Sequence, residues 1–231
     1  MFNKAKKCIL LLAVLVMAIT LVGSGLSEKD IPREYKAALK KADMYANKMH
    51  MSKAAVYEQL ISEYGEKFTE DAAKYAIENV KADWKENALY NADMCANKMH
   101  MSKVAVYEQL ISEYGEKFTE EEAKYAIENV KANWKENALY KADMYANKMH
   151  MSKAAVYEQL ISEYGEKFTE EEAKYAIENV KANWKENALY KARTYADKMY
   201  MSDSAIYEQL ISEHGEKFTE EEAKYAIENL E

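Results

Sequence analysis

Cysteine, proline and glycine are all scarce in this 231-residue chain, with two, one and six residues respectively. The cysteines, Cys8 and Cys95, stand on either side of the one long apolar run, so the part that follows this run cannot form an internal disulfide. No stretch is low in complexity, and charged residues make up 31 % of the chain. These properties indicate an ordered, helix-rich protein that faces water.

The sequence also lacks the patterns that usually carry chemistry. Two glycines follow the apolar run and the other four occur once per repeat, so no glycine-rich phosphate loop is present. His50, His100 and His150 have no second histidine or cysteine at a zinc-type spacing, and we expect them at helix ends or in turns. We therefore predict no catalytic, cofactor-binding or metal-binding residue, and a protein that is not an enzyme.

What the chain does contain is a repeat with a period of 50 residues. Met-His-Met-Ser-Lys falls at Met49–Lys53, Met99–Lys103 and Met149–Lys153, and returns altered at Met199–Asp203. Residues 69–118 and 119–168 differ at only 6 of 50 positions. A period of this length is typical of an array of small structural units. Near-identical units suit repeated contact with a partner better than catalysis, which needs several different residues at one place.

The N-terminus is typical of an exported protein. Lys4, Lys6 and Lys7 precede Ile9–Val22, a run of 14 residues that is apolar except for Thr20, and small residues follow it. Extended to Leu26, the run approaches the ~20 residues of a spanning helix. Residues 1–26 are therefore either a cleaved signal peptide or a retained membrane anchor. Both place the repeats outside the cytoplasm, with membrane contact only through this segment.

Leu21-Val22-Gly23-Ser24 resembles a bacterial lipobox in which Ser24 stands at the position of the lipid-accepting cysteine. A hydroxyl cannot replace the thiolate in that processing. Two interpretations remain open, an ordinary cleavage site and a lipobox that has lost its cysteine. Under either one we expect no lipid on the mature chain.

The charge of the exported part excludes polyanionic partners. Removing Met1–Ser24 leaves 29 basic and 40 acidic residues, a net charge of -11. Phosphate backbones and anionic lipid surfaces repel such a chain.

One repeat, residues 84–130, reads as three short helices. Asp83 caps the first, with Glu86 completing a capping box, and Asn133/Glu136 and Asn183/Glu186 repeat this pair. Ser102 caps the second, and Gly115 should end it as a left-handed C-cap. Thr119 and Glu122 form a capping box for the third. The expected inner face of the second helix comprises Val106, Tyr107, Leu110, Ile111 and Tyr114.

The predicted fold is all-α, a tandem array of four three-helix, helix-turn-helix-like repeats. The expected boundaries are a linker at 27–34 and repeats at 35–80, 84–130, 134–180 and 184–231. No proline or glycine lies between Val130 and Trp134, so the third helix is free to continue into the next first helix. Trp84 and its copies occur once per junction and should form core there. Cys95 should fill a core position that holds tyrosine in the other repeats, and His214 should replace a core-facing tyrosine.

The second and third helices could be taken for a DNA-binding helix-turn-helix. A recognition helix must be basic to enter the groove, whereas the third helix opens with Thr119-Glu120-Glu121-Glu122. Together with export, this acidity excludes nucleic acid as the partner.

The segment Asn137–Asn179 closely resembles the Ltp family, host cell surface-exposed lipoproteins. It begins Asn-Ala-Leu-Tyr-Lys-Ala and contains Met-His-Met-Ser-Lys, and Ser112–Thr119 supplies the long and specific core Ser-Glu-Tyr-Gly-Glu-Lys-Phe-Thr. The resemblance runs from Tyr35 to Glu231. It implies tandem three-helix repeats on the outside of Gram-positive cells. The phage-encoded members act in superinfection exclusion, blocking DNA injection by contact with the phage tape measure protein. This chain departs from the family in lacking the lipobox cysteine and in having four repeats rather than two.

Two functions follow from the resemblance, a phage-exclusion protein that binds the tape measure protein or another injection component, and a general surface adhesin or envelope-binding protein. For the first function we expect a basic stretch of an extended phage protein to meet an acidic stripe at the starts of the third helices. Its members are Glu120, Glu121, Glu170, Glu171, Glu220 and Glu221. The alternative is that these residues only offset the helix dipole.

Overall fold

The computed structural model describes residues 30–230, so the predictions for the signal or anchor segment and for Ser24 lie outside the described residues. Within this range the chain forms twelve α-helices and no strand, three helices in each of four repeats, which confirms the predicted fold class. The helices are α1 (Arg33–Asn47), α2 (Lys53–Ile61), α3 (Glu70–Asn79), α4 (Trp84–Asn97), α5 (Lys103–Ile111), α6 (Glu120–Asn129), α7 (Trp134–Asp143), α8 (Lys153–Ile161), α9 (Glu170–Asn179), α10 (Trp184–Met199), α11 (Asp203–Ile211) and α12 (Glu220–Glu228). A short π-helix, η2 (Met144–Lys148), continues α7.

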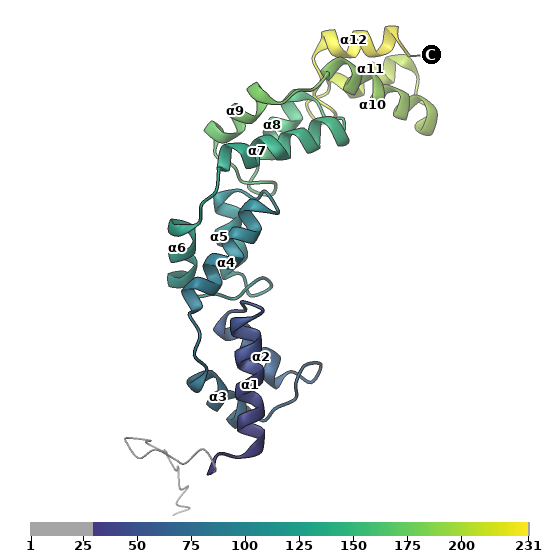
Figure 1. The fold of residues 1–231 in the computed structure, drawn as a ribbon. Helices are drawn as coiled ribbons and strands as arrows, with labels where there is room; N and C mark the ends of the chain where they lie inside the picture. Colours follow the sequence, from purple (N-terminus) through teal and green to yellow (C-terminus); the bar gives the residue numbers. More distant parts are fainter. Residues whose placement is uncertain (1–29, 231) are drawn as a thin grey trace, which may run out of the picture.

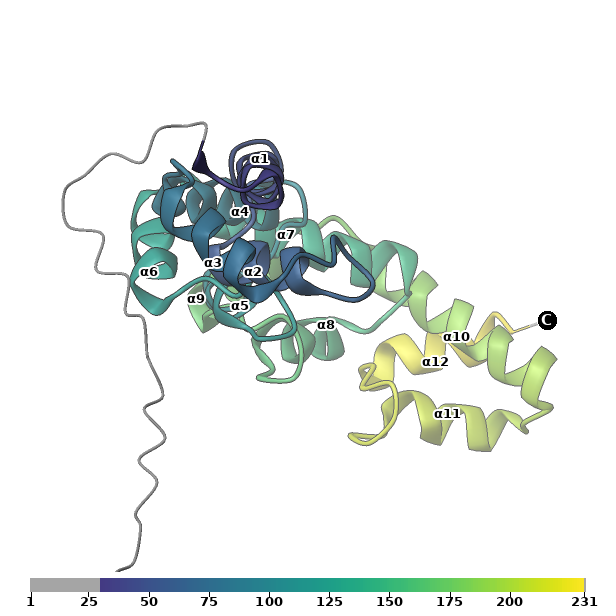
Figure 2. The same cartoon turned by 90° about the horizontal axis from the view of Figure 1, so that it is seen from below.

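The repeats follow one another end to end in an elongated, curved array, with α1 at one end and α12 at the other (Figures 1 and 2). Within each repeat the first helix packs along the third, and the second helix contacts both. The first helices of neighbouring repeats also meet, since α1 contacts α4, α4 contacts α7, and η2 contacts α10. The array is therefore held together by a line of first helices.

Each repeat has its own core, built mainly from small side chains. In the second repeat Ala88, Ala92 and Ala96 of α4 and Ala123 and Ala126 of α6 are fully buried, which lets these two helices approach closely. The second helix and the following loop supply the larger groups, Val106, Leu110 and Phe118. Small units of this kind bury a limited fraction of their surface, so contacts between neighbours contribute to stability.

Side-chain caps begin the helices where the sequence predicts them. The hydroxyl of Ser102 accepts from the backbone N–H of Ala105 at 3.2 Å, and Thr119 and Glu122 form a complete capping box. The box predicted at Asp83 is only half correct. Asp83 caps α4, but the Glu86 carboxylate accepts a hydrogen bond from the Tyr125 hydroxyl at 2.7 Å instead of returning to the cap.

The third helices do not continue into the next first helices. Helix α6 ends at Asn129, whose side-chain amide donates to the Tyr125 carbonyl at 2.8 Å, and Val130 is already extended at ψ 132°. Asn133 then starts α7 from an extended conformation, accepting from the Glu136 N–H. An N-cap residue must lie outside the helix that it caps, so the asparagine that begins one helix also prevents its fusion with the previous one.

The turn after the second helix differs from the prediction in three respects. Helix α5 ends at Ile111, and the left-handed residue is Lys117, at φ 58°, rather than Gly115. Gly115 is needed for a different reason, because a Cβ there would lie 2.4 Å from the Gln109 carbonyl oxygen. Tyr114, expected on the inner face, is fully exposed at the tip of this turn, and His214 at the matching position is exposed as well.

Candidate binding surface at the repeat junctions

A buried asparagine joins each repeat to the one before it. Asn87 of α4 is 4 % exposed, and its side-chain nitrogen donates to the carbonyls of Ala46 at 2.8 Å and Met51 at 3.0 Å. Asn137 and Asn187 repeat the arrangement at the other two junctions. Because both amide hydrogens are used, Oδ1 is left to accept, and Nδ1 of His50 lies 3.4 Å from it. Since an amide oxygen only accepts hydrogen bonds, Nδ1 of His50 is the donor in this pair.

The three junction histidines stack on tyrosines of the following repeat. The ring centroids lie 3.9 Å apart for His50 and Tyr90, 3.7 Å for His100 and Tyr140, and 3.8 Å for His150 and Tyr190. Each histidine has a left-handed backbone, with φ of 53–54°, and lies in the turn between the first and second helices of its repeat. The expected turn position is therefore correct, but nothing in the one-repeat pattern indicated the partner, since it lies 40 residues further along the chain.

An ion pair and a tryptophan complete the junction. Lys117 of the second repeat pairs with Glu58 of the first, and the pairs Lys167–Glu108 and Lys217–Glu158 follow at the next two junctions. Trp84 packs against the core of the preceding repeat, and Trp134 and Trp184 do the same. The prediction that these tryptophans form core at the joints is confirmed.

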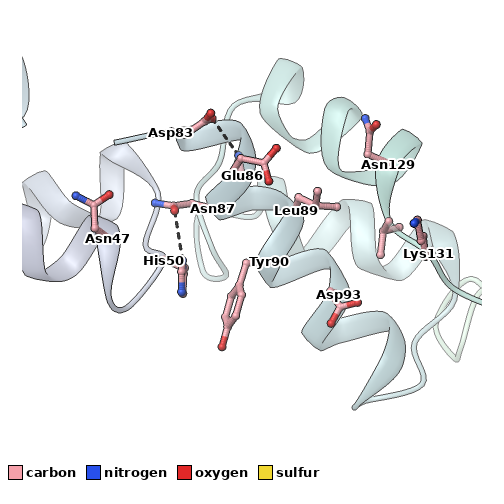
Figure 3. A pocket seen from close by; sticks show the side chains of 11 residues that line it. Asn47, His50, Asp83, Glu86, Asn87, Leu89, Tyr90, Asp93, Asn129 and Lys131 are labelled. Carbon is pink, nitrogen blue, oxygen red and sulfur yellow. Dashed lines mark hydrogen bonds between the residues drawn. The ribbon is translucent and has the colours of Figure 1, made fainter. Parts of the chain in front are cut away.

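An open groove lies beside each of these contacts. The first has a volume of about 590 Å³, the second about 630 Å³ and the third about 320 Å³. In the first groove the Tyr90 side chain projects from α4, with His50 on one side of its ring and Asp93 on the other (Figure 3). The remaining wall comes from Asn47, Asp83, Glu86, Asn87, Leu89, Asn129, Val130 and Lys131.

The outer ends of the array lack the junction residues. At the positions of Trp84, Asn87 and Tyr90 the first repeat carries Glu34, Ala37 and Lys40. At the position of His150 the last repeat carries Tyr200, which keeps the left-handed backbone at φ 53° but is exposed. The junction set is therefore confined to the three internal interfaces of the array.

The predicted acidic stripe is exposed, but each of its members has a lysine partner. Lys85 Nζ lies 2.7 Å from Glu121, and the same pair recurs as Lys135–Glu171 and Lys185–Glu221. Hydrogen bonding to Lys85 lowers the pKa of Glu121. Glu120, Glu170 and Glu220 pair with lysines four residues on within their own helices. The stripe residues are not among those that line the three junction grooves.

A partly buried tyrosine hydroxyl links the first helix to the turn in three of the repeats. Tyr145 donates to Glu166 at 2.5 Å, and Lys141 pairs with the same carboxylate at 3.1 Å. Burial and this hydrogen bond raise the pKa of Tyr145 to about 12. The second repeat has Asn91 and Cys95 at these positions. Cys95 is buried, as predicted for a residue that fills the tyrosine position, and burial raises the pKa of its thiol.

Residues 30–230 contain neither a membrane-spanning helix nor a cluster of metal ligands. No helix in this range combines the length and apolarity required to cross a bilayer. The same residues contain no group of three or more His, Cys, Asp or Glu side chains arranged to hold a metal ion.

Comparison with known proteins relates all four repeats to one family. The family model described as host cell surface-exposed lipoprotein (Lipoprotein_Ltp) matches residues 33–80, 83–130, 133–180 and 183–230. Among solved structures, the chain is similar to Ltp, a superinfection exclusion protein from the Streptococcus thermophilus temperate phage TP-J34. The two are 42 % identical over 44 % of this chain and 99 % of that one, with a TM-score of 0.40. The comparison with curated proteins gives no match. Since the family model covers every repeat, the chain belongs to the Ltp family of host cell surface-exposed lipoproteins.

Proposed function

We propose that this protein acts on the outer face of the cell in superinfection exclusion, protecting its host from incoming phage. The observation that carries the proposal is the match of the family model to all four repeats. The 42 % identity with a phage protein that carries out this function supports it. The basic and apolar N-terminal segment supplies the export that the proposal requires.

The partner is a component of the phage injection apparatus, for which the tape measure protein is our first candidate. An elongated partner with several contact points suits an elongated array. The matched part of this chain, 44 % of 231 residues, is about the length of two 50-residue repeats, so this chain has about twice as many repeats as the solved chain of the phage protein. Additional copies raise the effective concentration of contact points without requiring a new type of contact.

The acidic stripe is the contact surface that we propose for this partner. Glu120 and Glu121 and their copies are the acidic groups that recur at the starts of α6, α9 and α12. Their lysine partners neutralise part of this charge, so the attraction of a basic partner depends on the balance between the glutamates and these lysines. Exposed charge pairs are weak, and a basic partner can compete for the carboxylates.

Phage plating tests the function. Cells that express the protein should give fewer plaques than cells that do not, while phage adsorption is unchanged and entry of phage DNA is reduced. A block at adsorption would indicate the alternative, a general surface adhesin or envelope-binding protein that covers receptors.

Protease added to intact cells should degrade the repeats, and mass spectrometry should find no diacylglyceryl group on the mature N-terminus.

Two variants that remove the same four ion pairs but change the net charge in opposite directions test the stripe. Glu120, Glu121, Glu170 and Glu171 changed to Gln should weaken both protection and the salt-sensitive binding of the partner. Lys85, Lys124, Lys135 and Lys174 changed to Gln remove the same ion pairs but leave the acids, and should preserve or strengthen binding. Equal protection by both variants and the parent would show that the stripe serves only the helices.

A further inference from the structure

The grooves between repeats combine an aromatic ring with a fixed carboxylate. Tyr90 and Tyr140 are each 48 % exposed although a histidine covers one side of the ring. Asp93 lies on the other side of the Tyr90 ring (Figure 3), and Asp143, at the matching position, lines the second groove with Tyr140. A cation held between an aromatic face and a carboxylate gains from both.

The carboxylates are held in place before any ligand arrives. The side-chain amide of Asn97 donates to Asp93 at 2.7 Å, and that of Asn147 donates to Asp143 at 2.8 Å. Each bond uses one carboxylate oxygen and leaves acceptor capacity on the other. In both grooves the histidine stacks on the opposite side of the tyrosine ring, and in the first groove His50 itself lies 3.4 Å from the buried Asn87 amide oxygen.

The net negative charge of the side chains that line the grooves decreases from the first groove to the third. The first groove has three carboxylates, Asp83, Glu86 and Asp93, against Lys131. The second has two carboxylates and one lysine. The third has only Glu186, opposed by Arg193, which stands at the position of Asp93 and Asp143. This third groove is also about half the size of the others, at 320 Å³.

We propose that the first and second junction grooves each bind one cationic side chain, preferably an arginine, of an extended polypeptide, and that the third does so weakly because Arg193 supplies a positive charge from within. The planar guanidinium can lie on the free side of the tyrosine ring and donate to the aspartate at its edge. This inference deepens the proposed function, on which it rests only for the identity of the partner.

A peptide with three arginines separated by Gly-Ser spacers provides the test, with an otherwise identical peptide in which citrulline, a neutral isostere, replaces each arginine. Nuclear magnetic resonance of the repeat array at physiological salt should show saturable shifts at His50, Tyr90, His100 and Tyr140. The shifts around His150 and Tyr190 should be smaller, and citrulline should cause none.

The double variant Asp93→Arg, Asp143→Arg introduces the residue that α10 carries at this position, and should weaken peptide binding about tenfold or more. Its melting curve should change little, because the hydrogen bonds lost from Asn97 and Asn147 are at exposed positions. Arg193→Asp should bring the third groove into the response. Equal binding of citrulline, unchanged binding by the double variant, or shifts confined to Glu120 and Glu121 would each overturn the proposal. Phage plating separates the two levels, since protection without arginine binding refutes only the groove, and arginine binding without protection refutes only the proposed function.

Discussion

The side-chain nitrogen of Asn137 donates to two backbone carbonyls of the preceding repeat, 2.8 Å from that of Ala96 and 3.0 Å from that of Met101. Asn137 is buried and lies 41 positions after Ala96. Its side chain thus provides the hydrogen-bond donor for a carbonyl at the end of α4 and for another in the turn that follows. Stability in this array is therefore shared between neighbours, as in other repeat proteins.

Replacing Asn137 with Asp should weaken this junction. The carboxylate has the same shape but no hydrogen to donate, so two carbonyls lose their partner and face a negative charge. We expect a loss of about 1–3 kcal/mol in the free energy of unfolding, measured by denaturant titration. Asn129→Asp, at an exposed position that bonds only within its own helix, is the control and should cost less. Equal losses would show that the junction bond is not special.

His100→Ala and His100→Gly should separate stacking from backbone strain. Both remove the contact with Tyr140, which is worth about 0.5–1.5 kcal/mol. Only glycine relieves the left-handed backbone at φ 53°, so the glycine variant should be the more stable by up to about 1 kcal/mol. Thermal melting of the two variants beside the parent provides the measurement. A less stable glycine variant would contradict the role assigned to the backbone.

Gly115→Ala should destabilise the second repeat through a steric conflict. Its Cβ would come within 2.4 Å of a backbone oxygen that cannot move without breaking the end of α5. Costs of overpacking are typically about 1–3 kcal/mol. Thr119→Ser, which keeps the capping hydroxyl a few residues away, should leave the melting temperature nearly unchanged. A neutral Gly115→Ala would mean that the turn relaxes more easily than its hydrogen bonds suggest.

Asn91→Lys combined with Cys95→Tyr installs the lysine, tyrosine and glutamate set of the other repeats and removes the hydrogen bond, 2.8 Å long, from the Asn91 amide to the His50 carbonyl. The second repeat should therefore gain stability relative to the same lysine variant with Cys95→Phe. A tyrosine at 95 can donate to Glu116, a bond worth about 1 kcal/mol. In the first repeat, hydrogen bonds from Lys41 and then Tyr45 lower the pKa of Glu66. A lowered carboxyl pKa stabilises the folded state above the pKa of the unfolded chain, and this contribution is lost as the pH falls through the folded value.

The gain from this double variant should therefore be present at pH 7 and absent near pH 3. Asn91→Lys with Cys95→Phe fills the same space without the hydroxyl and should give a smaller gain. Denaturant titration at both pH values makes the comparison. A gain that persists in acid would assign the effect to ring packing alone.

Periodicity and capping chemistry were sufficient to predict the four repeats, their helices and most of their starts. Ser102, Thr119 and Asn133 act as caps because their side chains accept from backbone within three residues, which is local information. Tyr114 and Gly115 were assigned wrongly because α5 ends three residues earlier, where the chain turns back to pair Phe118 N–H with the Leu110 carbonyl. The spacing of apolar residues alone does not predict that hydrogen bond.

The junction grooves could not be predicted from one repeat because each forms between two. Tyr90 and Asn87 face the previous repeat rather than their own core, and a pattern read inside a single unit cannot distinguish these directions. The sequence nonetheless indicated these interfaces at the positions where the first and last repeats depart from the repeat pattern. Glu34, Ala37 and Lys40 break the pattern at the first repeat and Tyr200 breaks it at the last, which is where a residue serving an internal interface would be dispensable.

Those exceptions also bear on how separate molecules behave toward one another. A surface that joins one unit to the next in the same direction is a head-to-tail contact, and when such a contact recurs on both ends of a molecule it builds open filaments. Here the first repeat carries Glu34, Ala37 and Lys40 instead of the tryptophan, asparagine and tyrosine that contact the preceding repeat elsewhere in the array. The last repeat carries Tyr200 instead of the histidine that stacks on the following repeat. The residues that join the four units within one chain are therefore missing from the two surfaces that separate molecules would bring together, and we expect the array not to extend itself into filaments.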